Sequence, residues 1–421
     1  MTVLETQGLA ARHAARALAV AGTARKNAAL EAAARTIEAR QGEILAANAA
    51  DLEAAMAAGL RPALLDRLAL DEGRIAGIVE GVRQVAALPD PIGAVTKMDT
   101  RPNGLTIGKR RVPLGVIGII YEARPNVTVD AAALCLKSGN AALLRGGKEA
   151  FHSNQAFAAV LRDALEEAGL PRDCVALVAD TSRESANELM GLTEYLDVLI
   201  PRGGAGLIRF VRENARIPVI ETGAGIVHTY FDIDGDLEKG RAVVCNAKTR
   251  RVSVCNALDC LVIHRGRLTD LPELCAPLAG AHVTVYADEE AFAALDGHYP
   301  AGLLEHAAEE HFGTEFLDYK LAVKTVASLD GALAHIARYS SRHSEAIVTE
   351  NKQAATQFTR SVDAACVYVN VSTAFTDGGQ FGFGAEVGIS TQKLHARGPM
   401  GLPELTTYKY IVSGDGQIRQ P

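Results

Sequence analysis

The sequence has no tryptophan, no long apolar run and no long basic run. No stretch reaches the roughly 18 apolar residues that a membrane-spanning helix needs, so we expect no membrane partner. The formal net charge is −7 at pH 7, which argues against nucleic acid or an anionic membrane surface as a partner. The N-terminus also lacks a basic segment followed by an apolar one, so we expect a cytoplasmic protein.

Paired cysteine motifs are missing too. The seven cysteines are an odd number, and no C-x-x-C motif or paired histidine spacing joins them. The sequence therefore predicts neither a disulfide framework nor a metal site. Reduced thiols are the natural state of such a set, and any single cysteine is more often a small core residue than a chemical group.

The N-terminal part of the chain has a helical pattern. Residues 3 to about 90 are rich in alanine, leucine, glutamate and arginine, and apolar residues recur at helical spacing. Gly59 is a plausible helix stop, and Pro62 suits the first turn of the next helix. At 421 residues the chain is too long for one compact core, so we expect at least two domains.

Short apolar runs then alternate with helical segments. The runs of the first series are residues 114–121, 141–144, 174–178, 198–200 and 219–220. This alternation predicts a doubly wound parallel α/β sheet, which binds ligands at the carboxyl ends of its strands. A second series, over residues 260–360, predicts a second α/β domain.

Two segments have the pattern of isolated antiparallel strands. Asn103-Gly104 between extended segments predicts a hairpin. Residues 405–412 predict a strand with no obvious partner. Together they predict an oligomerisation arm, and hence a homo-oligomer.

Two glycine-rich loops follow predicted strands, Arg145-Gly-Gly-Lys148 and Pro201-Arg-Gly-Gly-Ala-Gly206. Neither is a dinucleotide fingerprint or a phosphate loop of the G-x-x-x-x-G-K type. Glycine pairs also end strands for steric reasons. The neighbouring cations and the N–H groups of the following helix make phosphate binding an equally good interpretation.

Cys245 and Cys255 each precede Asn-Ala, and Arg250 and Arg251 lie just upstream of the second cysteine. Nearby cations or a helix N-terminus lower the pKa of a thiol and make it a better nucleophile. Local sequence alone leaves a buried structural cysteine as the commoner alternative. Farther on, residues 372–386 form a glycine-dense polar stretch, which predicts an ordered functional loop.

Several blocks spread over almost the whole chain occur at the spacing of one known family. Two of them are Val254-Cys-Asn-Ala257 and Phe375-Thr-Asp-Gly-Gly379. The others are residues 113–130, 136–140, 144–149, 200–204, 246–248 and 388–399. On these blocks the chain resembles the γ-glutamyl phosphate reductases (glutamate-5-semialdehyde dehydrogenases), a family of the aldehyde dehydrogenase superfamily.

The resemblance implies an aldehyde-dehydrogenase-like α/β fold. We expect a dinucleotide-binding domain with a doubly wound parallel sheet in residues 1–99 and 113–245. A second α/β domain, the catalytic one, is expected in residues 246–390. A small β oligomerisation arm and C-terminal segment would comprise residues 100–112 and 391–421.

The family reaction is the NADPH-dependent reduction of L-glutamyl 5-phosphate to L-glutamate 5-semialdehyde and phosphate, the second step of proline biosynthesis. The resemblance places the nucleophilic cysteine at Cys255, which would form a thioester, and leaves Cys245 as structural. The Cys255 backbone N–H and Asn126 are candidate donors to the oxyanion. The resemblance leaves open an association with the glutamate 5-kinase that makes the substrate.

The same resemblance indicates NADP as the cofactor. Relatives that prefer NAD carry a ribose-binding glutamate at the position that corresponds to Lys148. A cation there, together with Arg145, suits a 2′-phosphate. The Gly203-Gly204 loop is the second expected cofactor contact.

The substrate anion needs other cations, because Ala374 stands where many relatives carry an arginine. Arg124, Lys393 and Arg397 are the candidates. Glu221 falls near the general base of hydrolytic aldehyde dehydrogenases, or is only a loop carboxylate. With Glu221 as base, the alternative function is a hydrolytic dehydrogenase acting on a semialdehyde. A second alternative is a catalytically silent NADP-binding protein.

Overall fold

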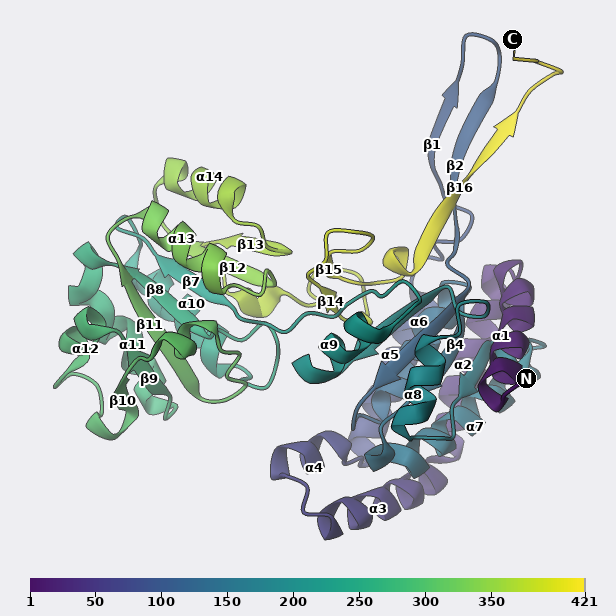
Figure 1. The fold of residues 1–421 in the computed structure, drawn as a ribbon, viewed down its shortest axis with the longest axis horizontal. Helices are drawn as coiled ribbons and strands as arrows, with labels where there is room; N and C mark the ends of the chain where they lie inside the picture. Colours follow the sequence, from purple (N-terminus) through teal and green to yellow (C-terminus); the bar gives the residue numbers. More distant parts are fainter. Residues whose placement is uncertain (420–421) are drawn as a thin grey trace. The chain divides into compact units, whose positions relative to one another are not determined.

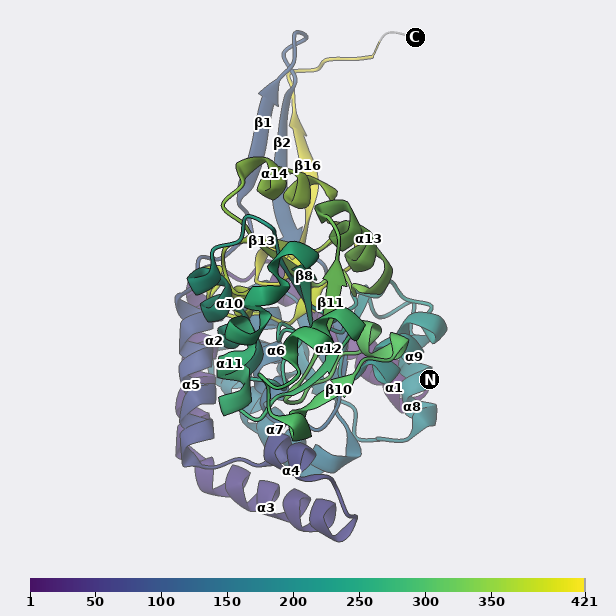
Figure 2. The ribbon, with the colours of Figure 1, turned by 90° about the vertical axis from the view of Figure 1, so that its left-hand side faces the viewer.

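The structure is a computed structural model that describes residues 1–419, apart from the side chains of Pro62, Ala63 and Ala205. The chain divides into two compact units. The first unit contains residues 1–222, 382–388 and the chain from 400 onward, and the second contains residues 223–381 and 389–399. Figures 1 and 2 show the ribbon coloured along the sequence.

Helices make up the N-terminal part of the first unit, as the periodicity predicts. Thr2 closes a capping box at the first helix, and Asp71 caps the fifth. Gly59 has a φ of 70° after the third helix, and Pro62 begins the fourth, as predicted. The helices are α1 (Val3–Ala19), α2 (Thr23–Ala39), α3 (Gln41–Ala57), α4 (Pro62–Leu68) and α5 (Glu72–Ala87). No helix within residues 1–419 is long and apolar enough to cross a membrane.

A parallel sheet with strand order β5-β4-β3-β6 forms the core of the first unit. All six residues of β3 are buried, which explains its unbroken apolar sequence. The strands are β3 (Val116–Tyr121), β4 (Ala141–Arg145), β5 (Val175–Leu177) and β6 (Val198–Arg202). The helices between and after them are α6 (Asn126–Lys137), α7 (Phe151–Glu167), α8 (Arg183–Met190) and α9 (Ala205–Asn214). The strand order reverses between β3 and β6, and such switch points are where open α/β sheets bind ligands.

The arm is an antiparallel sheet of order β1-β2-β16. Strands β1 (Val95–Thr100) and β2 (Thr106–Pro113) form the predicted hairpin. The C-terminal strand β16 (Thr406–Ser413), which has no visible partner in the sequence, pairs with β2 along its whole length. Figure 2 shows the three strands side by side. The last two residues of the predicted segment 391–421 lie outside the described residues.

The second unit contains a parallel sheet of order β10-β9-β11-β8-β7-β12-β13. Its strands are β7 (His228–Phe231), β8 (Cys260–His264), β9 (Thr284–Ala287), β10 (Leu304–His306), β11 (Lys320–Val326), β12 (Ser344–Val348) and β13 (Cys366–Val369). Its helices are α10 (Leu237–Thr249), α11 (Leu271–Gly280), α12 (Glu289–Leu295), α13 (Leu329–Tyr339) and α14 (Lys352–Ser361). The unit also holds the short pair β14 (Ile389–Ser390) and β15 (Gly398–Pro399).

The units divide at residue 222 rather than at the predicted residue 245. The reason is β7, a strand that the sequence reading missed. Its four residues, His-Thr-Tyr-Phe, contain no continuous apolar run, yet β7 pairs with β8 on one side and β12 on the other. Residues 389–399 also belong to the second unit, and residues 382–388 to the first, so the predicted end of the catalytic domain at 390 differs as well.

Candidate active site

Cys255 lies in a turn-rich loop between α10 and β8, and its side chain is half-buried. The loop is anchored at its end, where Leu258 N–H donates to the carbonyl of Ala247 at 3.0 Å. The N–H groups of Asp259 and Cys260 both donate to the carbonyl of Val227 at 3.0 Å. No helix begins at Cys255, so of the two sources of thiol activation that the sequence suggests, the helix N-terminus is wrong.

The segment before β7 runs directly against this loop. A Cβ placed on Gly225 would lie 1.6 Å from the Cys255 carbonyl oxygen. Gly225 also donates its N–H to Glu315 Oε1 at 2.9 Å. Glycine is required here because any side chain would displace the backbone of Cys255.

Asn256 joins the Cys255 loop to the glycine-rich loop predicted to carry function. Its Nδ2 donates to the carbonyls of Ala374 at 3.3 Å and Thr376 at 2.9 Å, and its own carbonyl accepts from Thr373 Oγ1 at 2.9 Å. The backbone at Ala374 therefore helps to position the residue next to Cys255. These bonds explain why asparagine follows the cysteine in the Val254-Cys-Asn-Ala257 block.

A buried charged pair that the sequence reading did not identify lies close to the same segment. Lys248 on α10 is fully buried, and its Nζ has no hydrogen-bond partner within the described chain. Burial lowers the pKa of Lys248 and raises the pKa of Asp259, while each charge partly offsets the effect on the other. Only the block Asn246-Ala-Lys248 signalled this position in the sequence.

Cys245 is separate from the loop that carries Cys255. It lies within α10, where its Sγ is 3.6 Å from the Thr249 hydroxyl. Its assignment as structural stays a prediction.

Two of the predicted substrate-binding cations come together in the second unit. Lys393 Nζ lies 2.8 Å from Asp363 Oδ2, and Arg397 Nη2 lies 2.8 Å from Asp363 Oδ1. Hydrogen bonds from Lys393 and Arg397 lower the pKa of Asp363 to about 2. The two cations thus share one carboxylate, which a substrate anion would have to replace or accommodate.

The predicted cofactor-binding cations lie in the first unit, at the carboxyl end of β4. Arg145 Nη2 donates to the carbonyls of Thr181 at 2.6 Å and Ser182 at 2.9 Å, so its position is set by the loop after β5. Its buried Nε has no acceptor among residues 1–419, and burial lowers the pKa of Arg145. Lys148 is exposed at the start of the short 3-10 turn before α7.

The Gly203-Gly204 loop lies at the switch point between β3 and β6, with Glu122 beside it. Gly204 N–H, at the start of α9, donates to Glu122 Oε2 at 2.8 Å. A Cβ on Gly203 would lie 2.5 Å from the same oxygen. A carboxylate therefore occupies the N–H donor that a cofactor phosphate would use, and it would have to withdraw first.

Asn126 is the first residue of α6, and its Nδ2 donates to Asp130 Oδ2 at 2.8 Å. Burial raises the pKa of Asp130 to about 6. Arg124 is exposed in the loop just before this helix. The structure places these two predicted site residues two positions apart, after the carboxyl end of β3.

Glu221, the candidate general base, lies near the end of the first unit. Its carboxylate is 3.6 Å from Arg212 Nη1 on α9. Glu221 thus takes part in an ion pair, and both its role as a base and its role as a loop carboxylate stay predictions.

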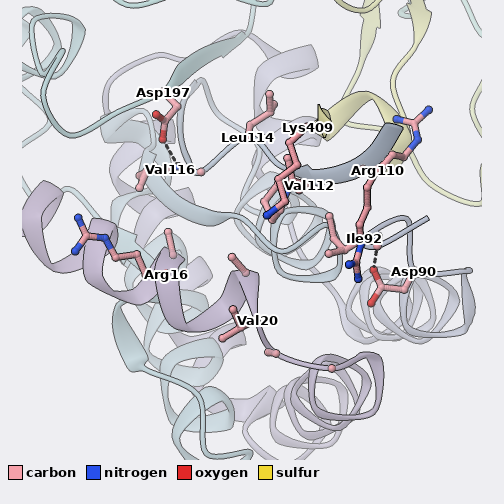
Figure 3. A pocket seen from close by; sticks show the side chains of 18 of the residues that line it. Arg16, Val20, Asp90, Ile92, Arg110, Val112, Leu114, Val116, Asp197 and Lys409 are labelled. Carbon is pink, nitrogen blue, oxygen red and sulfur yellow. Dashed lines mark hydrogen bonds between the residues drawn. The ribbon is translucent and has the colours of Figure 1, made fainter. Parts of the chain in front are cut away.

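A cavity of about 710 Å³ opens in the first unit beside α1, β2 and β16. Figure 3 shows Arg16, Arg110 and Lys409 around it. None of the predicted site residues lines this cavity. It is therefore not the expected cofactor or substrate site.

No family model matches the chain, but individual proteins and solved structures do. A γ-glutamyl phosphate reductase from Bacteroides fragilis is 57% identical over 411 residues, which cover 98% of each protein. The crystal structure of γ-glutamyl phosphate reductase from Thermotoga maritima matches with a TM-score of 0.96 and 45% identity over 100% of both chains.

An acetylating aldehyde dehydrogenase from Geobacillus thermoglucosidasius matches at a TM-score of 0.71 and 15% identity, covering 99% of this chain and 98% of its own. That likeness concerns the fold alone, and it confirms the predicted aldehyde-dehydrogenase-like α/β class. The identity to the reductases extends over nearly the full length, so it covers both units. The chain belongs to the γ-glutamyl phosphate reductase family, whose members are oxidoreductases.

Proposed function

We propose that the protein reduces L-glutamyl 5-phosphate to L-glutamate 5-semialdehyde and phosphate with NADPH, the second step of proline biosynthesis from glutamate. The observation that carries this proposal is the 57% identity to a γ-glutamyl phosphate reductase over 98% of the chain. The Cys255 loop supports it, because it holds a half-buried thiol between two backbone segments that position it.

Cys255 is the proposed nucleophile. Its thiolate attacks the acyl carbonyl, the carbon–oxygen bond to phosphate breaks, and a thioester forms on Cys255. The Cys255 N–H and the Asn126 amide are the proposed oxyanion donors, and one well-placed donor contributes about 3 kcal/mol. Release of the aldehyde breaks the carbon–sulfur bond and returns Cys255 to the thiolate.

Arg145 and Lys148 are the proposed contacts of the 2′-phosphate. The buried Nε of Arg145, which has no hydrogen-bond partner within residues 1–419, and the exposed ammonium of Lys148 fit an anionic group at the end of β4. The nicotinamide cofactor, when bound, supplies the hydride that reduces the thioester. Gly203 and Gly204 are the second proposed contact, on the condition that Glu122 withdraws from the Gly204 N–H.

Arg124, Lys393 and Arg397 are proposed to bind the carboxylate and phosphate of the substrate. Lys393 and Arg397 suit this role because Asp363 already holds them on one site. Because both side chains lie against the same carboxylate, a single substrate anion can contact both of them.

The arm is proposed to join subunits into a dimer or larger assembly. Large exposed apolar side chains on β1 and β16 support this, because such side chains are favourably buried against a partner. They are Val95, Met98, Tyr408, Tyr410, Ile411 and Val412.

We also propose a cytoplasmic location, because the reaction needs Cys255 as a reduced thiolate. An acyl phosphate hydrolyses readily, so an association with the glutamate 5-kinase that makes it would protect the substrate.

The reverse reaction tests the function. The protein is assayed with glutamate semialdehyde, phosphate and NADP, and each component is omitted in turn. The proposal expects NADPH formation only with all three. Formation of free glutamate and NADPH without phosphate would instead identify a hydrolytic dehydrogenase.

A further inference from the structure

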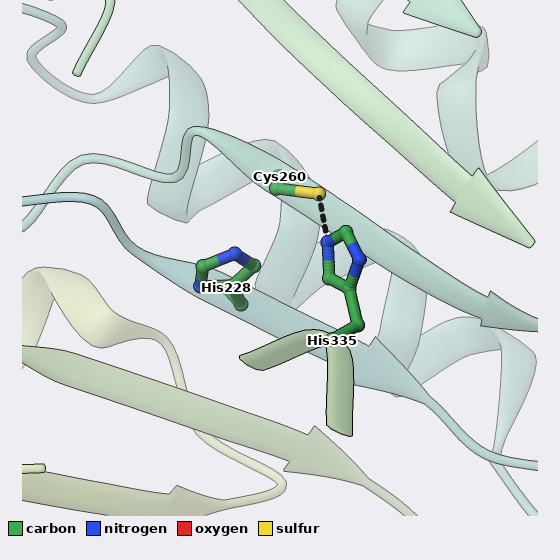
Figure 4. A group of neighbouring side chains, drawn as sticks. All are labelled: His228, Cys260 and His335. Carbon is green, nitrogen blue, oxygen red and sulfur yellow. Dashed lines mark hydrogen bonds between the residues drawn. The ribbon is translucent and has the colours of Figure 1, made fainter. Parts of the chain in front are cut away.

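The core of the second unit contains a group of side chains that the reductase chemistry does not use. His228 begins β7, Cys260 begins β8 and His335 lies on α13. Each offers one ligand atom, and these atoms lie within 4.8 Å of one another (Figure 4). All three residues are buried. Their separation in the chain, 32 and 75 residues, explains why no sequence motif revealed them.

The separation of one ligand pair suits a tetrahedral ion. Cys260 Sγ lies 3.6 Å from His335 Nε2. Bond lengths of about 2.3 Å to sulfur and about 2.1 Å to nitrogen put two tetrahedral ligands of zinc roughly 3.6 Å apart. A metal ion would thus replace the S–H···N contact with little movement of either side chain.

The His228 ring is already oriented as in a metal site. Its Nδ1 lies 3.1 Å from Glu345 Oε2, and its Nε2, in a ring with no exposed surface, has no hydrogen-bond partner among the residues that the structure describes. One ring nitrogen of His228 faces Cys260 and His335 in Figure 4. A carboxylate that accepts the Nδ1 proton leaves the Nε2 lone pair for a metal, as in carboxylate–histidine–metal triads.

The sheet register produces this arrangement. Glu345, His228 and Cys260 are direct neighbours across β12, β7 and β8. A carboxylate, an imidazole and a thiol therefore lie in one row, and α13 brings His335 to it. His335 is edge-on to His228, with ring centroids 5.5 Å apart.

We propose that His228, Cys260 and His335 bind one divalent ion of the zinc class, with Glu345 orienting His228. Binding forms one Zn–S and two Zn–N bonds, and the Cys260 thiol proton goes to solvent. The charges of the ion, the thiolate and the Glu345 carboxylate then sum to zero. This balance removes the free-energy cost of burying an unpaired carboxylate.

Such an ion would hold together the beginnings of β7 and β8. Those strands follow directly on Gly225 and on the Cys255 loop, and the N–H of Cys260 donates to the carbonyl of Val227. The site would stabilise the base of the nucleophile loop without touching substrate.

Cobalt binding to the full-length protein tests this site. The double variant Cys245→Ser/Cys255→Ser serves as the reference protein, because it removes both half-buried thiols, which would also bind metal. The reference is loaded with Co²⁺ and gel-filtered, and bound metal and the near-ultraviolet thiolate-to-cobalt band are measured. We expect about one cobalt per chain, the band, and its displacement by Zn²⁺.

Cys260→Ser and Cys260→Ala in this background should lose the band. Cys275→Ser is the matched control, since Cys275 is equally buried in the same unit but lies on α11, and it should keep the band. Glu345→Gln should weaken Co²⁺ binding about 10–100-fold. Absence of the band from the reference protein would overturn the proposal. So would its survival in both Cys260 variants, or an equal loss in Cys275→Ser.

Discussion

Gly225 and Cys255 touch through their backbones: a Cβ on Gly225 would lie 1.6 Å from the carbonyl oxygen of Cys255. The Cys255 loop therefore leaves no room for any other residue at position 225. This contact joins the segment before β7 to the loop before β8, two segments that the sequence separates by 30 residues.

Gly225→Ala should displace the Cys255 loop. Overpacking of this kind costs about 1–3 kcal/mol, and a displacement of roughly 1 Å at a reacting group lowers the rate about 100-fold. Measurement of kcat/KM and of the urea unfolding midpoint checks both effects. Gly302→Ala is the control in the same unit, because a Cβ at Gly302 would meet no atom within 4 Å. Equal behaviour of the two variants would contradict the tight contact.

Cys255→Ser should abolish reduction of the acyl phosphate, by roughly 1,000-fold or more, because the hydroxyl is a far weaker nucleophile than a thiolate. Cys245→Ser should retain most activity, since Cys245 lies within α10 beside Thr249. NADPH oxidation with freshly made acyl phosphate is the measurement. Undiminished turnover by Cys255→Ser would rule out the thioester mechanism.

Lys148→Glu should lower kcat/KM with NADPH about tenfold or more, because a charge-assisted hydrogen bond to a phosphate contributes ~1.5–3 kcal/mol. The loss with NADH should be smaller, since NADH has no 2′-phosphate. Lys352→Glu, another exposed lysine at a helix start, is the control and should leave the NADPH-to-NADH ratio unchanged. An equal loss with both cofactors would show that Lys148 does not contact the 2′-phosphate.

His343 should make the stability depend on pH. It is fully buried, and burial lowers its pKa from 6.5 to about 4. The folded state then binds fewer protons than the unfolded state between these values, so stability is complete above pH 6.5 and falls as the pH drops toward 4. The slope from this residue is up to about 1.4 kcal/mol per pH unit.

Urea unfolding between pH 7 and pH 5 measures this slope. His343→Gln should reduce it, whereas replacement of the exposed His13 by glutamine should not. An unchanged slope in His343→Gln would mean that other groups cause the acid sensitivity.

Local elements could be predicted from the amino-acid pattern alone. Helical periodicity predicted helices over residues 3 to about 90, where α1 to α5 lie, Asn103-Gly104 predicted the hairpin, and unbroken apolar runs predicted β3 and β4. These patterns are visible because each element's own residues carry its period or its turn. The family resemblance likewise depended on contiguous blocks, and it is what predicts Cys255 rather than Cys245 as the nucleophile.

The pairing of distant segments became visible only in the folded chain. It gave β16 a partner in β2, added β7 to the second sheet, and moved the division of the chain to residue 222. It placed Glu122 on the Gly204 N–H and brought together His228, Cys260 and His335. These contacts arise because strand register and close backbone approach join residues that lie far apart in the chain. No local pattern records those contacts.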